Sequence, residues 1–156
     1  MGSLKEILDK IILFLDGFLK SQNEELGELE LGTAFSFKKR ELSPFKTAII
    51  AKVDGGKILS AGFSEENEKR LELKLCLKAY FGEKLSEETR EKVFMKLIEG
   101  LTATENGFFI KEISREKESF DKETGAIVLP ISFYMDLIFR RELPTQRVTD
   151  VVIKTK

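Results

Sequence analysis

The sequence has no histidine, no tryptophan, three prolines and a single cysteine, Cys76, among its 156 residues. Without histidine there is no imidazole base to activate a serine or cysteine nucleophile, and no imidazole ligand for a metal ion. One cysteine excludes an intramolecular disulfide. Cys76 falls on the polar side of a predicted strand, where we interpret it as a small, semi-buried side chain. The sequence therefore predicts no enzymatic activity, no metal and no cofactor.

Charge of one sign is also lacking, because 26 basic residues are balanced by 27 acidic ones and the net charge is −1. The chain as a whole has no general attraction for nucleic acid or for an anionic membrane. An apolar stretch, residues 11–19, is interrupted by Asp16 and Gly17 and is too short to span a bilayer. It lacks a secretory cleavage site, so we expect the protein in the cytoplasm.

The composition, with 42% apolar and 34% charged residues, is that of a soluble globular domain. A chain of this length buries roughly 70% of its unfolded surface, which suffices for a core without disulfides. We predict a single domain over residues 1–143, followed by a C-terminal tail or arm over residues 144–156.

Two segments carry apolar residues at helical spacing, residues 3–21 and 86–101. Ser3 and Ser86 are predicted to cap them, and Glu6 completes a capping box in the first. The first helix has a broad apolar surface that must pack on something larger than one neighbour. The second is predicted to cover a sheet.

The clearest strand is "RLELKLCLKAY", residues 70–80, because leucines at every second position give one apolar face only in an extended chain. The same alternation over residues 126–142 predicts a second long strand, in which Pro130 marks a bulge or an edge-facing position. Residues 21–32 are interpreted as a loop or a short edge strand. Shorter strands are expected at 34–42, 45–53, 57–64 and 108–120.

Asp54-Gly55-Gly56 predicts a tight hairpin between the strands at 45–53 and 57–64, because glycine accepts the positive φ of such turns. The predicted fold is therefore α+β, in the order α-β-β-β-β-α-β-β. An antiparallel, possibly mixed sheet is packed on one face by two helices.

Two basic clusters lie near predicted strand ends, Lys38-Lys39-Arg40 and Arg140-Arg141. Together they are candidates for one basic rim that meets an acidic partner or phosphate; solvated strand ends and a protein interface are the alternatives. Tyr80 and Tyr134 fall on the outward side of their strands, which is typical of a subunit contact. The connection around Pro44 is a further candidate interface.

The last segment, "TQRVTDVVIKTK", is short and rich in β-branched residues. One interpretation is a frayed tail or an extra edge strand. The other is an arm that adds to the sheet of a neighbouring subunit. The candidate interface residues in this segment are Val148, Val151 and Val152.

The element order is more informative than any single motif. An amphipathic helix ("LKEILDKIILFLDGFLK") precedes a strand reaching Pro44, a hairpin ("TAIIAKVDGGKILSAGF") and the leucine strand ("RLELKLCLKAYF"). One helix ("SEETREKVFMKLIEGL") and a closing hairpin ending "ISFYMDLIFRRE" follow. Over residues 4–142 this order resembles the tail terminator, or tail completion, proteins of long-tailed bacteriophages and prophage particles. The segment "VTDVVIK" departs from that pattern.

The resemblance implies a non-enzymatic structural protein that forms a ring, commonly of six subunits. Such a ring caps the tail tube and joins it to the head connector. The implied partners are further copies of the chain, the tail tube protein and the head–tail connector protein, with at most non-specific contact with passing DNA. The implied location is the bacterial cytoplasm during assembly and then the virion or tail-like particle.

Two other classes of function stay open from the residues alone. One is a small-ligand-binding or enzymatic domain with a curved sheet and a cone shape. It requires convergent polar groups inside, whereas the predicted inward positions are almost all Leu, Ile and Phe. The other is a bacterial protein-interaction adaptor unrelated to phage.

Overall fold

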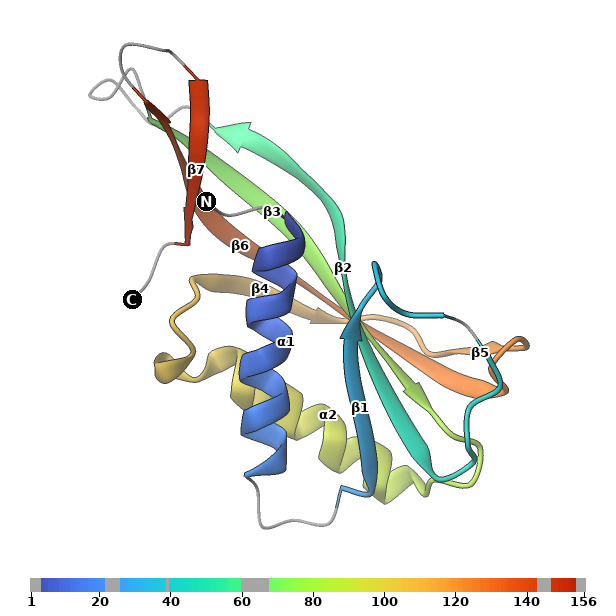
Figure 1. Ribbon diagram of the computed structural model, residues 1–156. Coiled ribbons are helices and arrows are strands. Elements are labelled where there is room, and N and C mark those ends of the chain that lie inside the picture. Colours follow the sequence, from blue (N-terminus) through green and yellow to red (C-terminus); the bar gives the residue numbers. More distant parts are fainter. Residues whose placement is uncertain (1–3, 22–25, 39, 60–67, 143–146, 154–156) are drawn as a thin grey trace.

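The computed structural model describes residues 4–21, 26–38, 40–59, 68–142 and 147–153 (Figure 1). At residues 57–59, 68–69, 138–142 and 147–153 only the backbone is described. The elements are α1 (Leu4–Lys20), β1 (Glu28–Thr33), β2 (Lys46–Leu59), β3 (Glu68–Phe81), α2 (Glu87–Thr102), a 3-10 turn (Thr104–Asn106), β4 (Ile110–Arg115), β5 (Ser119–Asp121), β6 (Ala126–Glu142) and β7 (Arg147–Ile153).

The strands form one mixed sheet in the order β1-β2-β3-β6-β4, with β5 and β7 also paired to β6. The β1–β2 pair is parallel and every other pair is antiparallel. The α+β class with a largely antiparallel, partly mixed sheet and two helices is thus confirmed. The elements between the helices differ in detail from the predicted order, as described below.

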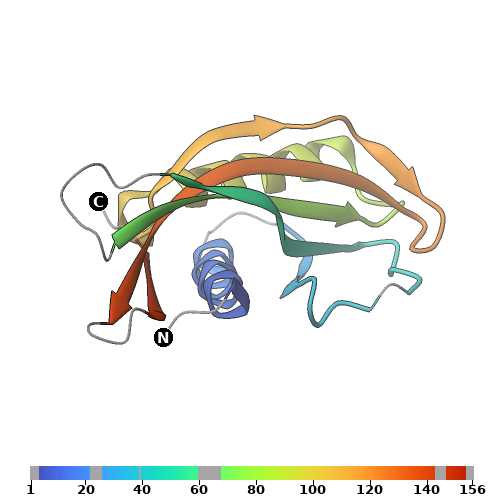
Figure 2. The same ribbon diagram turned by 90° about the horizontal axis from the view of Figure 1, so that it is seen from above.

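The alternating leucines of β3 point to the helices, as their spacing predicts. Leu73, Leu75 and Leu77 are buried in one cluster with Leu8 and Leu15 of α1, and the same cluster takes in the apolar stripe of α2. Both helices therefore cover the same face of the sheet, which we call the inner face. The sheet curves over α1, so that the helix lies on its concave side (Figure 2).

Strand β6 has a different set of partners on each edge. One edge pairs with β3 from Ile127 to Arg140, and the other pairs in succession with β5, β4 and β7. Pro130, which has no N–H to donate, lies where the pairing passes from β5 to β4. Its carbonyl still accepts a hydrogen bond from the backbone N–H of Glu116 at 2.9 Å.

Helix α2 begins as its sequence predicts. The Ser86 side chain accepts a hydrogen bond from the backbone N–H of Thr89 at 3.1 Å, and Glu87 and Glu88 occupy the first turn. Near the end of α2, a Cβ added at Gly100 would lie 2.9 Å from the Leu15 side chain. The close packing of the two helices therefore depends on glycine at this position.

The hairpin predicted at Asp54-Gly55-Gly56 is wrong. These residues lie inside β2, where the register with β3 shifts between Val53 and Gly55 and the φ of Gly55 is 134°. A bulge and a tight turn both require glycine in such a conformation, so the same dipeptide satisfies either. Residues 46–53 and 57–59 consequently belong to one strand, and residues 60–64 of the predicted second strand lie outside the described residues.

The strand predicted at residues 34–42 is also wrong, because the described part of this segment forms turns and irregular structure. It lies across the outer face of the sheet, where Phe37 packs on Tyr80 with ring centroids 5.4 Å apart. The backbone N–H of Leu42 donates to the carbonyl of Thr124 at 3.0 Å and holds this connection in place.

Two strands appear where the sequence left a choice. Residues 28–33, in the segment interpreted as a loop or short edge strand, form the edge strand β1. Residues 147–153 form β7, an additional strand on β6, so the sheet continues past the predicted domain boundary at residue 143. The predicted strand at 108–120 is divided into β4 and β5.

Candidate functional site

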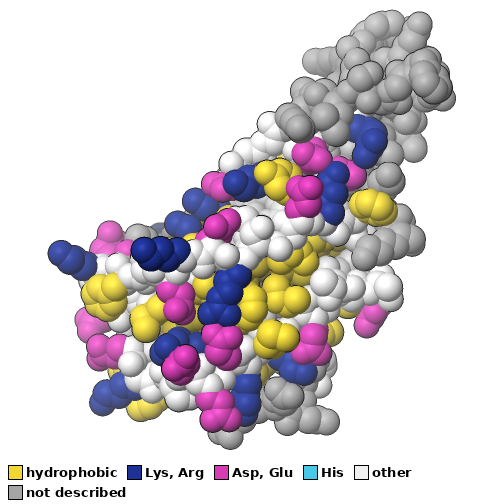
Figure 3. Space-filling view, turned by 180° about the vertical axis from the view of Figure 1, so that it is seen from behind, with side chains coloured by type: hydrophobic (Ala, Val, Ile, Leu, Met, Phe, Trp, Pro, Cys, Tyr) yellow, Lys and Arg dark blue, Asp and Glu magenta, His cyan; other side chains and the backbone are white. Residues whose placement is uncertain are grey.

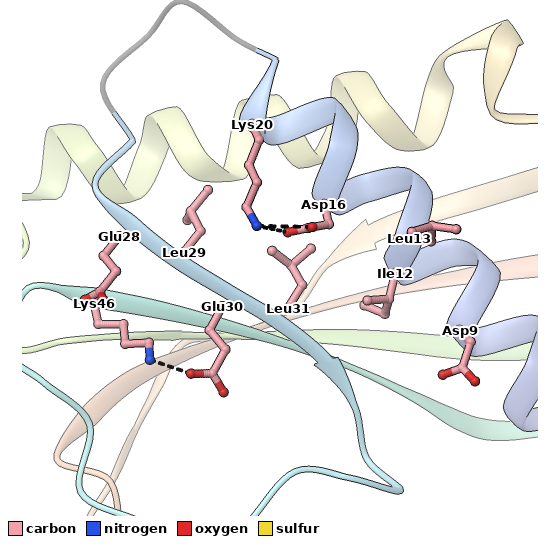
Figure 4. Close-up of a pocket in the computed structure, with 10 residues that line it drawn as sticks. All are labelled: Asp9, Ile12, Leu13, Asp16, Lys20, Glu28, Leu29, Glu30, Leu31 and Lys46. Atoms are coloured by element: carbon pink, nitrogen blue, oxygen red, sulfur yellow. Dashed lines mark hydrogen bonds and ion pairs between the residues drawn. The ribbon is translucent and has the colours of Figure 1, made fainter.

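A groove of about 480 Å³ lies between α1 and the edge strand β1 (Figure 4). Among the described residues, β1 pairs with β2 alone, so its other edge is open beside the groove. An open edge presents unpaired backbone N–H and C=O groups to any extended segment that approaches it. The groove is lined by Asp9, Ile12, Leu13, Asp16, Lys20, Glu28, Leu29, Glu30, Leu31 and Lys46.

Both elements contribute apolar side chains to the groove. Leu13 is 74% exposed, the highest value among the large hydrophobic side chains described as exposed. Leu29 and Leu31 point from β1 to the inner face, and Ile12 also packs at the margin of the core. An exposed leucine next to partly buried ones extends the core surface out to the strand edge, as expected where another chain binds.

The rim of the groove is charged and mostly paired. Lys20 lies 3.0 Å from Asp16, Lys5 lies 3.0 Å from Asp9, and Lys46 is paired with Glu30. The lining has four carboxylates and two ammonium groups, so its net charge is −2. Lys5 and Arg40 pair with two of these carboxylates from outside the lining, so the charges around the groove are close to balanced.

The opposite edge of the sheet is closed to pairing along β4. The register of β4 with β6 shifts between Lys111 and Ser114, and Glu112 has a φ of 54°, which is rare for a side chain of this type. Bulges of this kind twist an edge away from an incoming strand. Arg115 forms two hydrogen bonds with Glu91, at 2.7 and 3.0 Å, and its guanidinium lies 4.3 Å from the ring centroid of Phe94, so β4 is fixed to α2.

The outer face carries a buried ionic cluster. The Asp136 side chain is 4% exposed and receives a hydrogen bond from Arg70 at 3.1 Å. Lys111 lies 2.8 Å from Glu72 and 3.5 Å from Asp136. The hydrogen bond to Glu72 is the main cause that raises the pKa of Lys111. Within the described residues no group of three potential ligands is placed to hold a metal ion.

Tyr80 lies on the outer face, as its place in the alternation predicts, but it is not available for a subunit contact. It is 5% exposed because the 34–45 connection covers it through Phe37. Tyr134 is half-buried on the outer face, beside Lys74 and Glu72 in a pocket of about 250 Å³. Pro44 is half-buried, and its carbonyl accepts a hydrogen bond from the backbone N–H of Lys84 at 2.9 Å.

The two basic clusters do not form one rim. Lys38 and Arg40 are exposed in the connection that packs over the Tyr80 end of β3, and Lys39 lies outside the described residues. Arg140 and Arg141 belong to the far end of β6, where Arg140 pairs in register with Glu68 at the other end of β3. The full length of β3 separates the clusters.

The valines of the C-terminal segment belong to β7. Val151 and Val152 are in register with Phe139 and Ile138 of β6, and Val148 is in register with Arg141. This places the candidate interface residues of the segment in a strand at an edge of the sheet, with a register shift between Val148 and the other two.

The surface is otherwise mixed in charge. Figure 3 shows Lys and Arg side chains interspersed with Asp and Glu on the face seen from behind, around a central group of hydrophobic side chains. This face has no continuous basic area of the kind that nucleic-acid binding requires. Over the described residues, neither helix combines the length and the apolar character needed to cross a membrane.

Cys76 is buried on the outer face, and burial raises the pKa of its thiol. A thiol held in its protonated form is a poor nucleophile. The interpretation of Cys76 as a small buried side chain agrees with this environment.

The residues of the groove were not predicted from the sequence, although two signals for them exist. "ELEL" at residues 28–31 has the alternation that identified β3, over only four residues. Leu13 falls outside the apolar stripe of its helix, which is the expected signature of an exposed contact residue.

Comparison of the sequence with protein families and with curated proteins gives no match.

Proposed function

We propose that this protein is a non-enzymatic assembly protein that forms a ring from several copies, as the tail terminators of long-tailed phages do. The observation that carries the proposal is the open β1 edge beside the exposed Leu13. A strand edge with apolar surface next to it is poorly suited to remain in water, and pairing with another chain satisfies both features.

The sheet also has two different edges. One edge is β1, and the other is formed by β4, β5 and β7, which pair with β6. A contact between unlike surfaces of identical copies repeats from copy to copy, and it closes into a ring when the rotation divides a full turn. This arrangement needs no further protein to hold the ring together.

In this function the ring meets the tail tube protein on one side and the head–tail connector protein on the other. The exposed Lys38 and Arg40 and the chain around Arg140 and Arg141 lie at opposite ends of the sheet. The two clusters are therefore too far apart to form one continuous rim. We assign each cluster to a different neighbouring protein, or to the wall of the channel through which DNA passes.

The alternative of a cone-shaped ligand-binding domain requires a cavity beneath the sheet. The inner face is filled by leucine, isoleucine and phenylalanine side chains that are packed against both helices. A packed interior of this kind offers few polar groups to orient a ligand. The structure therefore favours assembly over ligand binding.

The proposal is tested by sedimentation velocity and negative-stain electron microscopy of the purified protein. We expect closed rings with a mass that is a multiple of 17.8 kDa. Leu13→Glu places a charge in the groove and should leave a folded monomer with an unchanged Tm. Met95→Glu is the matched control, because Met95 is 52% exposed on α2 and does not line the groove.

Two results would overturn the proposal. One is a species of 17.8 kDa at every concentration tested. The other is a ring that persists with Leu13→Glu, since the groove would then not be the contact surface.

A further inference from the structure

We infer that β1 of one copy pairs in antiparallel orientation with β7 of the next copy, so that the sheet continues around the ring. This inference rests on the proposed function and names the two edges that it requires. It depends on strand direction and on the difference between the available edges.

The direction of each strand follows from the pairing. β1 is parallel to β2, β2 is antiparallel to β3, β3 to β6, and β6 to β7. β7 therefore runs opposite to β1 within one copy. When copies are related by rotation about an axis that runs broadly along the strands, β7 of one copy also runs opposite to β1 of the next copy. β7 beside the next β1 then forms an antiparallel pair, the commoner kind of strand pairing.

Of the three strands on the far edge of β6, β7 is the best partner for β1. β4 is bulged at Glu112 and fixed to α2 through Arg115. β5 has three residues, too few for a stable ladder. β7 also has a register shift with β6, between Arg140 and Arg141, but its seven residues are close in number to the six of β1.

β1 has few of the devices that usually prevent edge pairing, and its two glutamates are the exception. Its sequence, "ELELGT", contains no proline and no lysine, and its six residues pair with β2 in unbroken register. Leu29 and Leu31 stand on one side of the strand, with Leu13 next to them in the groove. A strand that pairs with β1 therefore forms backbone hydrogen bonds and also packs its side chains on these leucines.

The two edges occupy diagonally opposite corners of the sheet. β1 lies beside the part of β2 that pairs with Leu77–Phe81, and β7 lies beside the end of β6 that pairs with Glu68–Leu71. The strands of the ring must therefore run obliquely to its axis. Closed β-barrels accommodate the same stagger by tilting their strands.

The test uses pairs of single-cysteine proteins in a Cys76→Ala background, so that any disulfide must join two copies. One protein carries Gly32→Cys in β1, where an added Cβ meets Ser36 at an ordinary 3.8 Å. It is mixed under oxidising conditions with a mass-tagged protein that carries Val148→Cys, Val151→Cys or Val152→Cys. The matched control partner carries Ser114→Cys, an exposed position in β4.

We expect the Gly32→Cys protein to form a cross-linked dimer with at least one of the β7 variants. It should form no such dimer with the control partner, Ser114→Cys. A Gly32–Gly32 cross-link, or a Gly32–Ser114 cross-link in rings that are otherwise intact, would overturn the β1–β7 pairing and leave the ring itself standing. Absence of any assembly by sedimentation would overturn the proposed function together with the pairing. An unchanged Tm for each variant confirms that the comparison is between folded proteins.

Discussion

Lys111 Nζ lies 2.8 Å from Glu72 Oε2 and 3.5 Å from Asp136 Oδ1, and so it bridges two carboxylates on neighbouring strands. Glu72 and Asp136 are directly opposite each other in the β3–β6 register. Like charges in such positions repel, and Asp136 is almost completely buried. Lys111 from β4, together with Arg70, which donates a hydrogen bond to Asp136, therefore compensates the two acids on the outer face. Lys111 fixes β4 to the sheet at the same time.

Replacing this cation should destabilise the fold. Lys111→Met leaves Glu72 and Asp136 facing each other, and we expect the free energy of unfolding to fall by about 1–2 kcal/mol at neutral pH, because Lys111 is partly exposed. Urea denaturation measures the change. Glu72→Gln in the Lys111→Met background should recover part of the loss; no recovery would mean that repulsion between the acids is not the cause.

The contribution of Lys111 should depend on pH at the alkaline end. The pKa of Lys111 is raised above its ordinary 10.5, chiefly by its hydrogen bond to Glu72. The stabilisation is therefore complete below that ordinary value and is lost as the pH rises through the raised one. Stability curves of wild type and Lys111→Met should run parallel from pH 7 to 9 and converge above 10.5; a constant gap would contradict this.

The Glu91–Arg115 pair should show the opposite dependence. The hydrogen bonds from Arg115 are the main cause that lowers the pKa of Glu91 below its ordinary 4.5. The pair therefore stabilises the fold above that value and ceases to do so as the pH falls through the lowered one. We expect Glu91→Gln to cost about 0.5 kcal/mol at pH 7, because the pair is exposed, and nothing at pH 2. Thermal unfolding of wild type and Glu91→Gln at both pH values measures this difference, and an equal cost at the two pH values would contradict the prediction.

Substitution of Gly82 tests how the 34–45 connection is packed, and substitution of Gly17 is the matched control. A Cβ at Gly82 would lie 2.4 Å from the backbone oxygens of Ser43 and Pro44, whereas a Cβ at Gly17 meets nothing within 4 Å. Gly82→Ala should lower the free energy of unfolding by about 2–4 kcal/mol or displace the connection. Gly17→Ala, within α1, should raise it by about 0.5–1 kcal/mol. If Gly82→Ala leaves the free energy of unfolding unchanged, the connection is not packed against this glycine.

The long elements could be predicted because their apolar residues repeat with one period over many residues. Eleven residues of strict alternation identify β3, and a capped stripe identifies α2. The shorter elements failed for physical reasons. Glycines at 55 and 56 suit a bulge as well as a turn. The alternation at Phe35 and Phe37 has the pattern of a strand, but Phe37 covers Tyr80 from an irregular segment.

The groove could not be predicted because it is formed by segments that are far apart in the sequence. Leu13 comes from α1, Leu31 from β1 and Lys46 from the start of β2, and the sequence signals at Leu13 and Leu31 do not indicate that these residues meet. Parallel pairing of β1 with β2 places these residues together. Pairing direction depends on tertiary packing, and local periodicity does not determine it.

The most direct test of the account is amide hydrogen exchange of residues 28–33, measured by mass spectrometry in a dilution series that spans assembly. The open edge of β1 should become protected when copies associate, because its free N–H groups then enter a ladder, while residues 110–115 of the bulged β4 edge should exchange at the same rate throughout. Equal exchange of residues 28–33 in the monomer and in the assembled protein would contradict the account.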